Sequence, residues 1–382
     1  MRVPFFSSRP TIFCDDLSVN ARAILSDLDA DFSTRPDRAD LIWMRKGYRP
    51  MQRRLRRCQL LNHIPDEGAM VNKGRLTAHL KAFDRRRTDG DLAVRDFYPE
   101  TYRLYADEER EAFFAQLPDT DVRDNLWILK PDDLSKGRGV KILWQFDRLR
   151  RMYDHPEDII FDPQIERGRD YIIQRYIRNP LLLDGRKSEI RLYWLIACLD
   201  PLLVLLYKEG TVRLNSRRFR LADFDDTLIH VTNVYQQKRH PDYDPSLTLK
   251  WRFSRLQSYL TEDLKLAGPD FVEAQLKPQF KRCLAYVVQA TIDALTTTPT
   301  EGLYFGLYGA DLILDDALRP WLTEIQKGPG LSYDDPVKAQ VIPPMLCEAA
   351  QIALEVQARV RTGQPLTRLD SVDGFEWILN DA

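Results

Sequence analysis

Apolar residues along this chain fall into short runs separated by polar stretches, and their spacing predicts a mixture of strands and helices. Compact apolar runs, the pattern of buried strands, lie at Thr11–Cys14, Ala39–Met44, Trp127–Pro131, Tyr171–Ile177, Leu192–Leu199 and Leu203–Tyr207. Helical periodicity covers Val19–Leu28, a segment beginning near Lys73, and residues 270–297 and 344–361, with Pro278 near a break. The pattern predicts a chain of mixed α/β (α+β) class with more than one domain.

The segment 308–331 predicts a β-hairpin. Two short apolar runs, Leu312–Leu314 and Trp321–Ile325, flank a polar stretch at 315–320 that contains the residues of a short turn. The two runs therefore form the two strands of the expected hairpin.

One register of this hairpin pairs 314 with 321 and places Asp311 opposite Glu324. Gln326 points to the same side as Glu324, because side chains alternate along a strand. Two carboxylates and an amide oxygen on one sheet face suit Mg²⁺ held against a phosphate. A solvated hairpin face carries the same residue types, so both interpretations stand at this point.

Charged residues also occur within two other predicted strands. Glu189 and Arg191 share one face of the strand that continues into Leu192–Leu199, and Arg213 follows in a later strand. A core strand has little reason to carry a charge unless the charge is paired or faces a ligand. His230, without a second histidine at ligand spacing, is interpreted as a hydrogen-bonded structural imidazole.

A glycine-containing loop follows the predicted strand that ends at Lys130. Gly137 and Gly139 would let the backbone approach a phosphate closely. The loop matches neither the P-loop nor the dinucleotide fingerprint, and Gly-x-Gly is more often an ordinary turn.

Composition narrows the class of protein. The 382 residues are 44% hydrophobic and 30% charged, and 56 basic and 57 acidic residues give a net charge of −1, which offers no global attraction for nucleic acid. The chain has five cysteines, at Cys14, Cys58, Cys198, Cys283 and Cys347. Their number is odd and no CxxC spacing occurs, which favours reduced thiols over a zinc site or disulfide bonds. We expect a cytoplasmic protein.

No segment predicts membrane insertion, because Asp200 and Pro201 interrupt the longest apolar run and no signal-peptide pattern opens the chain. The strongest local charge is the basic segment 45–57. It is either a solvated helix face or a docking surface for an acidic partner or phosphates.

Several fragments together resemble the tubulin tyrosine ligase-like family of ATP-grasp amino-acid ligases. They occur in the family's order, at about its spacing, over most of residues 40–340: WILKPDDLSKGRGVKIL, YIIQRYIRNPLLLDGRKSEIRLY, LYKEGTVRL, HVTN and GADLILDDALRPWLTEIQ. The resemblance implies an ATP-grasp fold. It implies a small N-terminal α/β domain at 1–61, a central domain with a glycine-rich lid at 62–177, and a C-terminal antiparallel-sheet domain with the metal site at 178–382. ATP would lie between the last two.

The resemblance also implies roles for individual residues. Those expected at the nucleotide are Lys73, Lys130, Ser135, Gly137, Gly139, Gln174, Tyr176, Ile177, Lys187, Glu189, Thr232, Asn233 and Lys238. The expected metal ligands are Asp311, Glu324 and Gln326, and the expected catalytic residues are Arg191, Arg213 and Glu324. The family usually has Asp at the position of Glu189 and Asn at that of Gln326, so each side chain here reaches about 1.5 Å further.

The implied activity is an ATP- and Mg²⁺-dependent ligation of an amino acid to a carboxylate of a protein or peptide, through an acyl phosphate. Glutamylation, glycylation and tyrosination are the forms of this reaction, and an acidic tail is one form of acceptor. Two alternatives stay open. One is a nucleotide-binding pseudoenzyme or adaptor, and the other is an ATP-grasp ligase that acts on a small molecule or free peptide.

Overall fold

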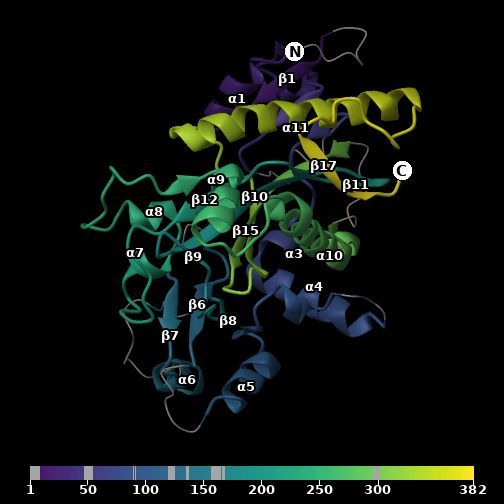
Figure 1. The fold of residues 1–382 in the computed structure, drawn as a ribbon. Coiled ribbons are helices and arrows are strands. Elements are labelled where there is room, and N and C mark those ends of the chain that lie inside the picture. The colour runs from purple at the N-terminus through teal and green to yellow at the C-terminus, as the bar shows by residue number, and fades with distance from the viewer. Residues whose placement is uncertain are drawn as a thin grey trace.

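The computed structural model describes residues 9–46, 55–88, 90, 92–118, 125–134, 137–155, 165, 168–295 and 302–382. Within these ranges the chain forms a parallel sheet, a large antiparallel sheet and a small antiparallel sheet, with helices packed between and around them (Figure 1). The expected mixture of helix and sheet is confirmed, whereas the division at 61 and 177 stays a prediction.

The parallel sheet is formed mainly by the N-terminal segment. Its strand order is β14-β4-β3-β1-β2, with bounds Leu303–Tyr304, Leu60–Leu61, Leu41–Trp43, Thr11–Cys14 and Asp31–Phe32. Helices α1 (Val19–Leu25) and α11 (Pro336–Thr362) share an apolar core with these strands. Figure 1 shows α11 lying between this sheet and the large antiparallel sheet.

The large antiparallel sheet is organised around the long strand β10 (Arg186–Leu199). Its other strands are β9 (Leu182–Leu183), β11 (Leu202–Tyr207), β12 (Thr211–Leu214), β13 (Lys250–Trp251), β15 (Gly306–Leu314), β16 (Pro320–Lys327) and β17 (Phe375–Asn380). Even-numbered residues of β10 between Ile190 and Ile196, such as Trp194, share a core with α10 (Lys277–Leu295), and odd-numbered ones, such as Leu195, share a core with α11. Both faces are therefore covered, which explains the nearly continuous apolar run.

The small sheet has the strand order β5-β8-β6-β7, with bounds Thr101–Arg103, Tyr171–Arg175, Trp127–Pro131 and Lys141–Leu143. Its own core contains Phe113 of α5 (Asp107–Ala115), Leu149 of α6 (Asp147–Asp154) and Trp127. The other α-helices of the described residues are α3 (Gly68–Val71), α4 (Lys73–Arg86), α7 (Thr227–His230), α8 (Val234–Gln237) and α9 (Phe253–Ser258). Short 3₁₀ turns lie at Pro36–Arg38 and Val94–Asp96 (η2).

Three helices differ from their predicted bounds. The helix expected over Val19–Leu28 ends at Leu25. The α-helix expected over 270–297 begins at Lys277, preceded by the π-helical segment Val272–Leu276, so the break near Pro278 is real. The helix expected over 344–361 begins earlier, at Pro336, and contains Pro343 and Pro344. Proline usually ends a helix, and for that reason the sequence pattern concealed the first turns.

The hairpin β15–β16 has the expected partners at its centre but not at its turn. Leu314 pairs with Pro320, so the predicted pairing of 314 with 321 is wrong. An irregularity between Asp311 and Leu312 absorbs one residue, and Asp311 consequently lies opposite Glu324, as predicted. The bulge therefore places both acids at the expected level of the sheet.

Glu355 of α11 provides a test of how the C-terminal segment is held. Its fully buried carboxylate accepts hydrogen bonds from the backbone N–H groups of Asp370 (2.9 Å) and Ser371 (2.8 Å) and pairs with Arg359 (2.6 Å). We expect Glu355→Ala to lower the free energy of unfolding by about 2–5 kcal/mol, because it leaves two backbone N–H donors without their acceptor. Arg359 loses one acidic partner and keeps the other, Asp370, at 2.9 Å. Urea unfolding measures this, and exposed Glu111→Ala should change stability by less than about 0.5 kcal/mol.

No helix among the described residues is both long and apolar enough to cross a bilayer. All five cysteines are free thiols, as expected.

Candidate functional site

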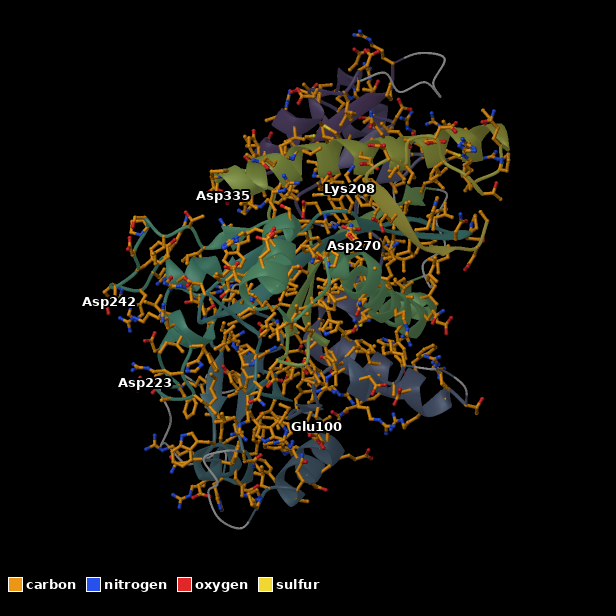
Figure 2. The ribbon with its side chains drawn as sticks, in the orientation of Figure 1. Glu100, Lys208, Asp223, Asp242, Asp270 and Asp335 are labelled. Carbon is orange, nitrogen blue, oxygen red and sulfur yellow. The ribbon has the colours of Figure 1, made fainter. Side chains whose placement is uncertain are left out.

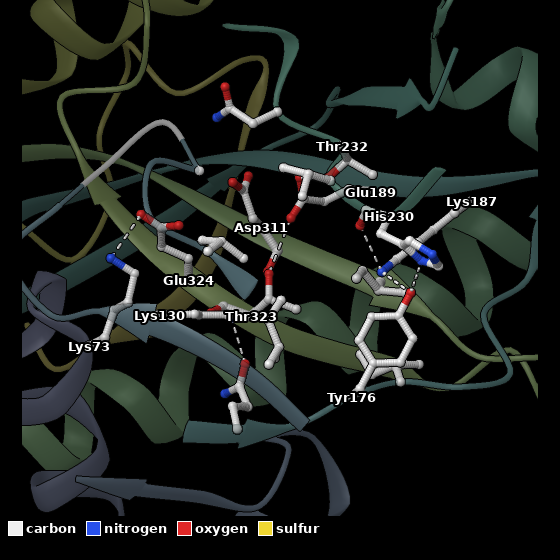
Figure 3. Close-up of a pocket in the computed structure, with 18 of the residues that line it drawn as sticks. Lys73, Lys130, Tyr176, Lys187, Glu189, His230, Thr232, Asp311, Thr323 and Glu324 are labelled. Carbon is white, nitrogen blue, oxygen red and sulfur yellow. Dashed lines mark hydrogen bonds and ion pairs between the residues drawn. The ribbon is translucent and has the colours of Figure 1, made fainter. Parts of the chain in front are cut away.

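A cleft lies between the small sheet and the face of the large sheet that carries β10, β15 and β16 (Figure 3). Its walls come from β6, the loop after it, β8, the segment 230–233 and the hairpin. The charged residues that interrupt the apolar strands gather on the hairpin and β10 side, so the charges singled out in the sequence belong to one place.

Two arginines and two carboxylates form a buried lattice on this sheet face. Arg191 of β10 lies opposite Asp311 of β15, and Glu189 of β10 lies opposite Arg213 of β12. The Arg191 guanidinium donates to both oxygens of Asp311, with Nη2 at 2.8 Å from Oδ2. Arg213 Nη2 lies 2.7 Å from Glu189 Oε2 and 2.7 Å from Asp311 Oδ1, so it bridges the two acids.

The lattice sets the charge states of its acids. Burial alone would raise the pKa of Asp311, but Arg191 and Arg213 outweigh it and hold that pKa at about 2. Burial, followed by the neighbouring Asp311 charge, raises the pKa of Glu189. Thr232 and Thr323 also donate hydrogen bonds to Glu189, at 2.6 and 3.2 Å. Asp311 is therefore a firmly ionised carboxylate, and Glu189 holds its charge less firmly.

Three lysines point into the cleft from different elements. Lys130 Nζ donates to Gln174 Oε1 at 2.7 Å, and Lys187 Nζ donates to the Tyr176 hydroxyl and the His230 carbonyl, both at 3.1 Å. Lys73, at the start of α4, donates to the Leu134 carbonyl at 2.8 Å. All three side chains are buried, which concentrates positive charge in a region of low dielectric.

Burial also lowers the pKa values of two of these lysines. The pKa of Lys187 falls to about 7 and that of Lys130 to about 8, because the desolvated ammonium form is penalised. Such shifts mark a site that gains stability when an anion enters it.

Glu324 presents a carboxylate to the cleft beside Lys73, with Oε1 and Nζ 3.8 Å apart (Figure 3). Gln326 donates from Nε2 to Asp311 Oδ2 at 3.2 Å. Across the described ranges no group of three or more His, Cys, Asp and Glu side chains is arranged to hold a metal. Mg²⁺ usually takes only one or two protein carboxylates together with water and phosphate oxygens. Glu324, which faces the cleft, fits that role, whereas both oxygens of Asp311 already accept from guanidinium groups and would have to be shared with the ion.

Most residues expected at the nucleotide line this cleft. Those that do are Lys73, Lys130, Gly137, Gln174, Tyr176, Ile177, Lys187, Glu189, Thr232 and Asn233, and two of the expected metal ligands, Asp311 and Glu324, line it as well. Arg191, Arg213, Gly139, Gln326 and Lys238 are not among its lining residues. Ser135 lies outside the described residues.

The residues that do not line the cleft lie in different places. Arg191 and Arg213 lie beneath it in the lattice, whereas Lys238 is exposed just beyond α8. Gly139 adopts φ +68° and faces Pro131, where an added Cβ would come within 2.8 Å of the ring. This contact gives Gly139 a local structural reason to be glycine.

Nothing in the sequence indicated Thr323, a residue of β16 that lines the cleft and donates a hydrogen bond to Glu189. A lone threonine next to Glu324 gave no signal, since simple alternation places neighbours on opposite faces. His230 also lines the cleft, and its ring contacts the Tyr176 hydroxyl (2.9 Å) and the Ala222 carbonyl (2.8 Å), which confirms its structural interpretation.

Comparison with known proteins gives consistent matches. The model of the tubulin-tyrosine ligase family matches residues 51–360. A protein polyglycylase of Macaca fascicularis is 33% identical over 304 residues, which are 76% of this chain and 47% of the relative. An inactive polyglycylase of Homo sapiens is 31% identical over 301 residues, 76% and 43% of the two chains. A probable tubulin polyglutamylase of Bos taurus is 29% identical over 362 residues, 84% and 72%. This chain spans about half the length of the two polyglycylases.

Proposed function

Since the chain belongs to the tubulin-tyrosine ligase family, we propose that it is an ATP-dependent ligase that joins an amino acid to a carboxylate of a protein. The curated relatives include polyglycylases and probable tubulin polyglutamylases, so glycine and glutamate are the leading amino acids and an acidic protein tail the leading acceptor. ATP would lie in the cleft between the small sheet and the hairpin, with the adenine against Gln174, Tyr176 and Ile177.

The observation that carries the proposal is the convergence of Lys73, Lys130 and Lys187 on one cleft opposite Glu324. Such a cluster of buried cations suits phosphate ligands, because their negative charge offsets the free-energy cost of desolvating the ammonium groups. Glu324 and Asp311, with Gln326, would hold Mg²⁺, which when bound neutralises phosphate charge.

The chain's own residues would act electrostatically. ATP would phosphorylate the acceptor carboxylate, and the amine of the incoming amino acid would then attack the acyl phosphate and release phosphate. Charge develops on phosphoryl and carbonyl oxygens, and Lys130 and Lys73 lie where they would share it. Arg191 and Arg213 would act from beneath the cleft, where they would fix Asp311 in its ionised state.

A direct assay tests the proposal. The protein is incubated with Mg-ATP, a lysate as the source of acceptor, and each labelled amino acid in turn, and mass spectrometry then identifies the modified peptide. We expect labelled glycine or glutamate on an acidic peptide. No transfer of any amino acid would contradict the ligase assignment.

One observation favours a second candidate, a nucleotide-binding protein without ligase activity. Both Asp311 oxygens are occupied by guanidinium groups, and the longer Gln326 stands in the proposed metal set. The human relative is itself named an inactive polyglycylase. ATP-dependent thermal stabilisation without turnover would favour this candidate.

The lysine pKa values predict the pH dependence of nucleotide binding. Above its lowered pKa, Lys187 is neutral in the free protein and must take up a proton to pair with a phosphate. We therefore expect ATP affinity to fall as pH rises from about 7 to 9, by up to about tenfold per unit. Calorimetry at constant ionic strength measures this, with adenosine as the uncharged control. Lys187→Arg, which stays charged, should make the profile less steep and leave the part due to Lys130, whose pKa is lowered to about 8. An unchanged profile would contradict the role of Lys187.

A further inference from the structure

A second groove lies on the opposite side of the 175–177 segment from the cleft. Its walls are one face of α4 (77–85), the segment 94–102, the segment 175–179 and the hairpin turn 315–321. We call it the rear groove. Arg175, Tyr176 and Ile177 line both the cleft and the rear groove, so one stretch of chain separates the two spaces.

The rear groove has aromatic side chains held under cations. Lys81 Nζ lies 4.7 Å from the centre of the Tyr102 ring, and the Arg319 guanidinium lies 5.5 Å from the centre of the Trp321 ring. The rings fix the positions of two positive charges on two different walls. A ligand that reaches from one wall to the other therefore meets apolar surface with a cation at each side. Each of these cations already has an acid partner, since Lys81 pairs with Glu109 at 3.0 Å and Arg319 pairs with Asp315 at 2.9 Å.

The acids of the rear groove are mostly engaged already. Asp84 accepts from the Tyr286 hydroxyl (2.7 Å) and the Val94 backbone N–H (3.0 Å). Glu100, labelled in Figure 2, pairs with Arg175, and Asp315 accepts from the backbone and side chain of its own turn.

Two cations there are not engaged. Neither Arg85 nor Arg95 makes an ion pair with any side chain in the described ranges, and both are exposed. Asp316 is the acid of the groove whose carboxylate likewise has no partner in those ranges. The groove thus retains more unmatched positive than negative charge, and this favours an acidic ligand with apolar or aromatic groups.

Two hydrogen-bond routes connect the rear groove to the cleft. Groove-lining Thr101 accepts from Gln174 Nε2 at 2.9 Å, and the other end of Gln174 holds Lys130 at 2.7 Å. Groove-lining Thr77 bonds the Tyr98 hydroxyl at 2.9 Å and donates to the Lys73 carbonyl at 2.8 Å. A ligand that moves Thr101 or Thr77 would thus disturb hydrogen bonds that reach Lys130 and Lys73 in the cleft.

We propose that the rear groove binds an acidic peptide segment of a partner protein, and that its occupancy changes the affinity of the cleft for nucleotide. The cations of the rear groove come from three separate elements, α4, η2 and the hairpin turn, so an extended peptide could contact several of them along its length. This inference does not depend on ligase activity, because binding alone tests it.

The test uses the full chain and a fluorescein-labelled polyglutamate peptide with one central tyrosine, at about 50 mM ionic strength, where screening is modest. Fluorescence anisotropy should show saturable binding, weakened at least about tenfold in the double variant Arg85→Glu/Arg95→Glu. The matched control Arg86→Glu/Arg282→Glu reverses two exposed arginines outside the groove and should bind within about twofold of the native chain. A polyglutamine peptide with the same tyrosine should bind weakly.

The coupling is tested with saturating peptide. The dissociation constant for ATP should change by at least about threefold, and ATP should change the peptide's dissociation constant by the same factor. Thr101→Val, checked by thermal melting, should bind the peptide but reduce this mutual effect. Equal binding of polyglutamine, undiminished binding by Arg85→Glu/Arg95→Glu, or an ATP affinity unchanged by peptide would overturn the proposal.

Discussion

Replacing Glu324 with glutamine is expected to lower ligation by about 10²–10³, equivalent to about 3–4 kcal/mol, while the fold remains intact. The carboxylate faces the cleft beside Lys73, and glutamine keeps its size while removing the charge that would hold Mg²⁺ against phosphate. The side chain is partly exposed, and its contact with Lys73 is long at 3.8 Å, so stability should change by less than about 1 kcal/mol.

Initial rates with Mg-ATP, amino acid and acceptor measure this effect, and thermal melting measures stability. The matched control is Glu262→Gln, an exposed residue far from the cleft in sequence, which should ligate like the native chain. A native rate of ligation in Glu324→Gln would contradict the assignment of Glu324 as a ligand of Mg²⁺. If Glu324→Gln lost activity because it unfolded, the loss would report a role of Glu324 in stability and not in catalysis.

Arg213→Ala is expected to remove ligation and also to lower the free energy of unfolding by about 3–5 kcal/mol. The fold depends on this arginine because Arg213 bridges the carboxylates of Glu189 and Asp311 in the interior. Without it, two buried acids face each other with only Arg191 between them.

The pH dependence of the Arg213→Ala defect has a definite sign. In the native chain the lowered pKa of Asp311 contributes stability that is present above pH 3.8 and is lost as pH falls through about 2. In the variant the carboxylate pKa values rise, so their destabilising effect is full at neutral pH and diminishes as acid protonates them. Urea unfolding at about pH 5 and pH 7 should show the larger defect at pH 7.

Exposed Arg220→Ala serves as the control, since its pairing with Asp223 is at the surface and should be worth less than about 0.5 kcal/mol. A stable, folded Arg213→Ala protein would show that the two acids do not need their bridge.

The sequence located the strands with long apolar runs, such as β10 and β11, because their burial pattern is local. In β10 the alternate residues face two different cores, which makes the run from Leu192 almost wholly apolar, and a charge such as Arg191 stands out against it. Asp311 and Glu324 were also found to be opposite each other. The predicted register is wrong by one residue next to the turn. The bulge between Asp311 and Leu312 corrects this shift, so the prediction that Asp311 lies opposite Glu324 is confirmed.

Other features had no local signal. Strand β14 is two residues long and joins the N-terminal parallel sheet from a distant part of the chain, beside β4. Pro343 and Pro344 lie within a helix that packing stabilises, although their backbone preference opposes it. Both cases arise because tertiary contacts outweighed the local preference of the chain.

By itself the sequence determined the family, the main strands and helices, and which charged residues stand out from an apolar background, because residue type and spacing carry that information directly. Only the tertiary structure showed that Arg191 and Arg213 form ion pairs with Asp311 and Glu189. It alone also showed that the rear groove adjoins the cleft. Ion pairs such as these join residues up to 120 positions apart. Their pairing is set by strand register and by how the sheets close on each other, and neither can be read from neighbouring residues.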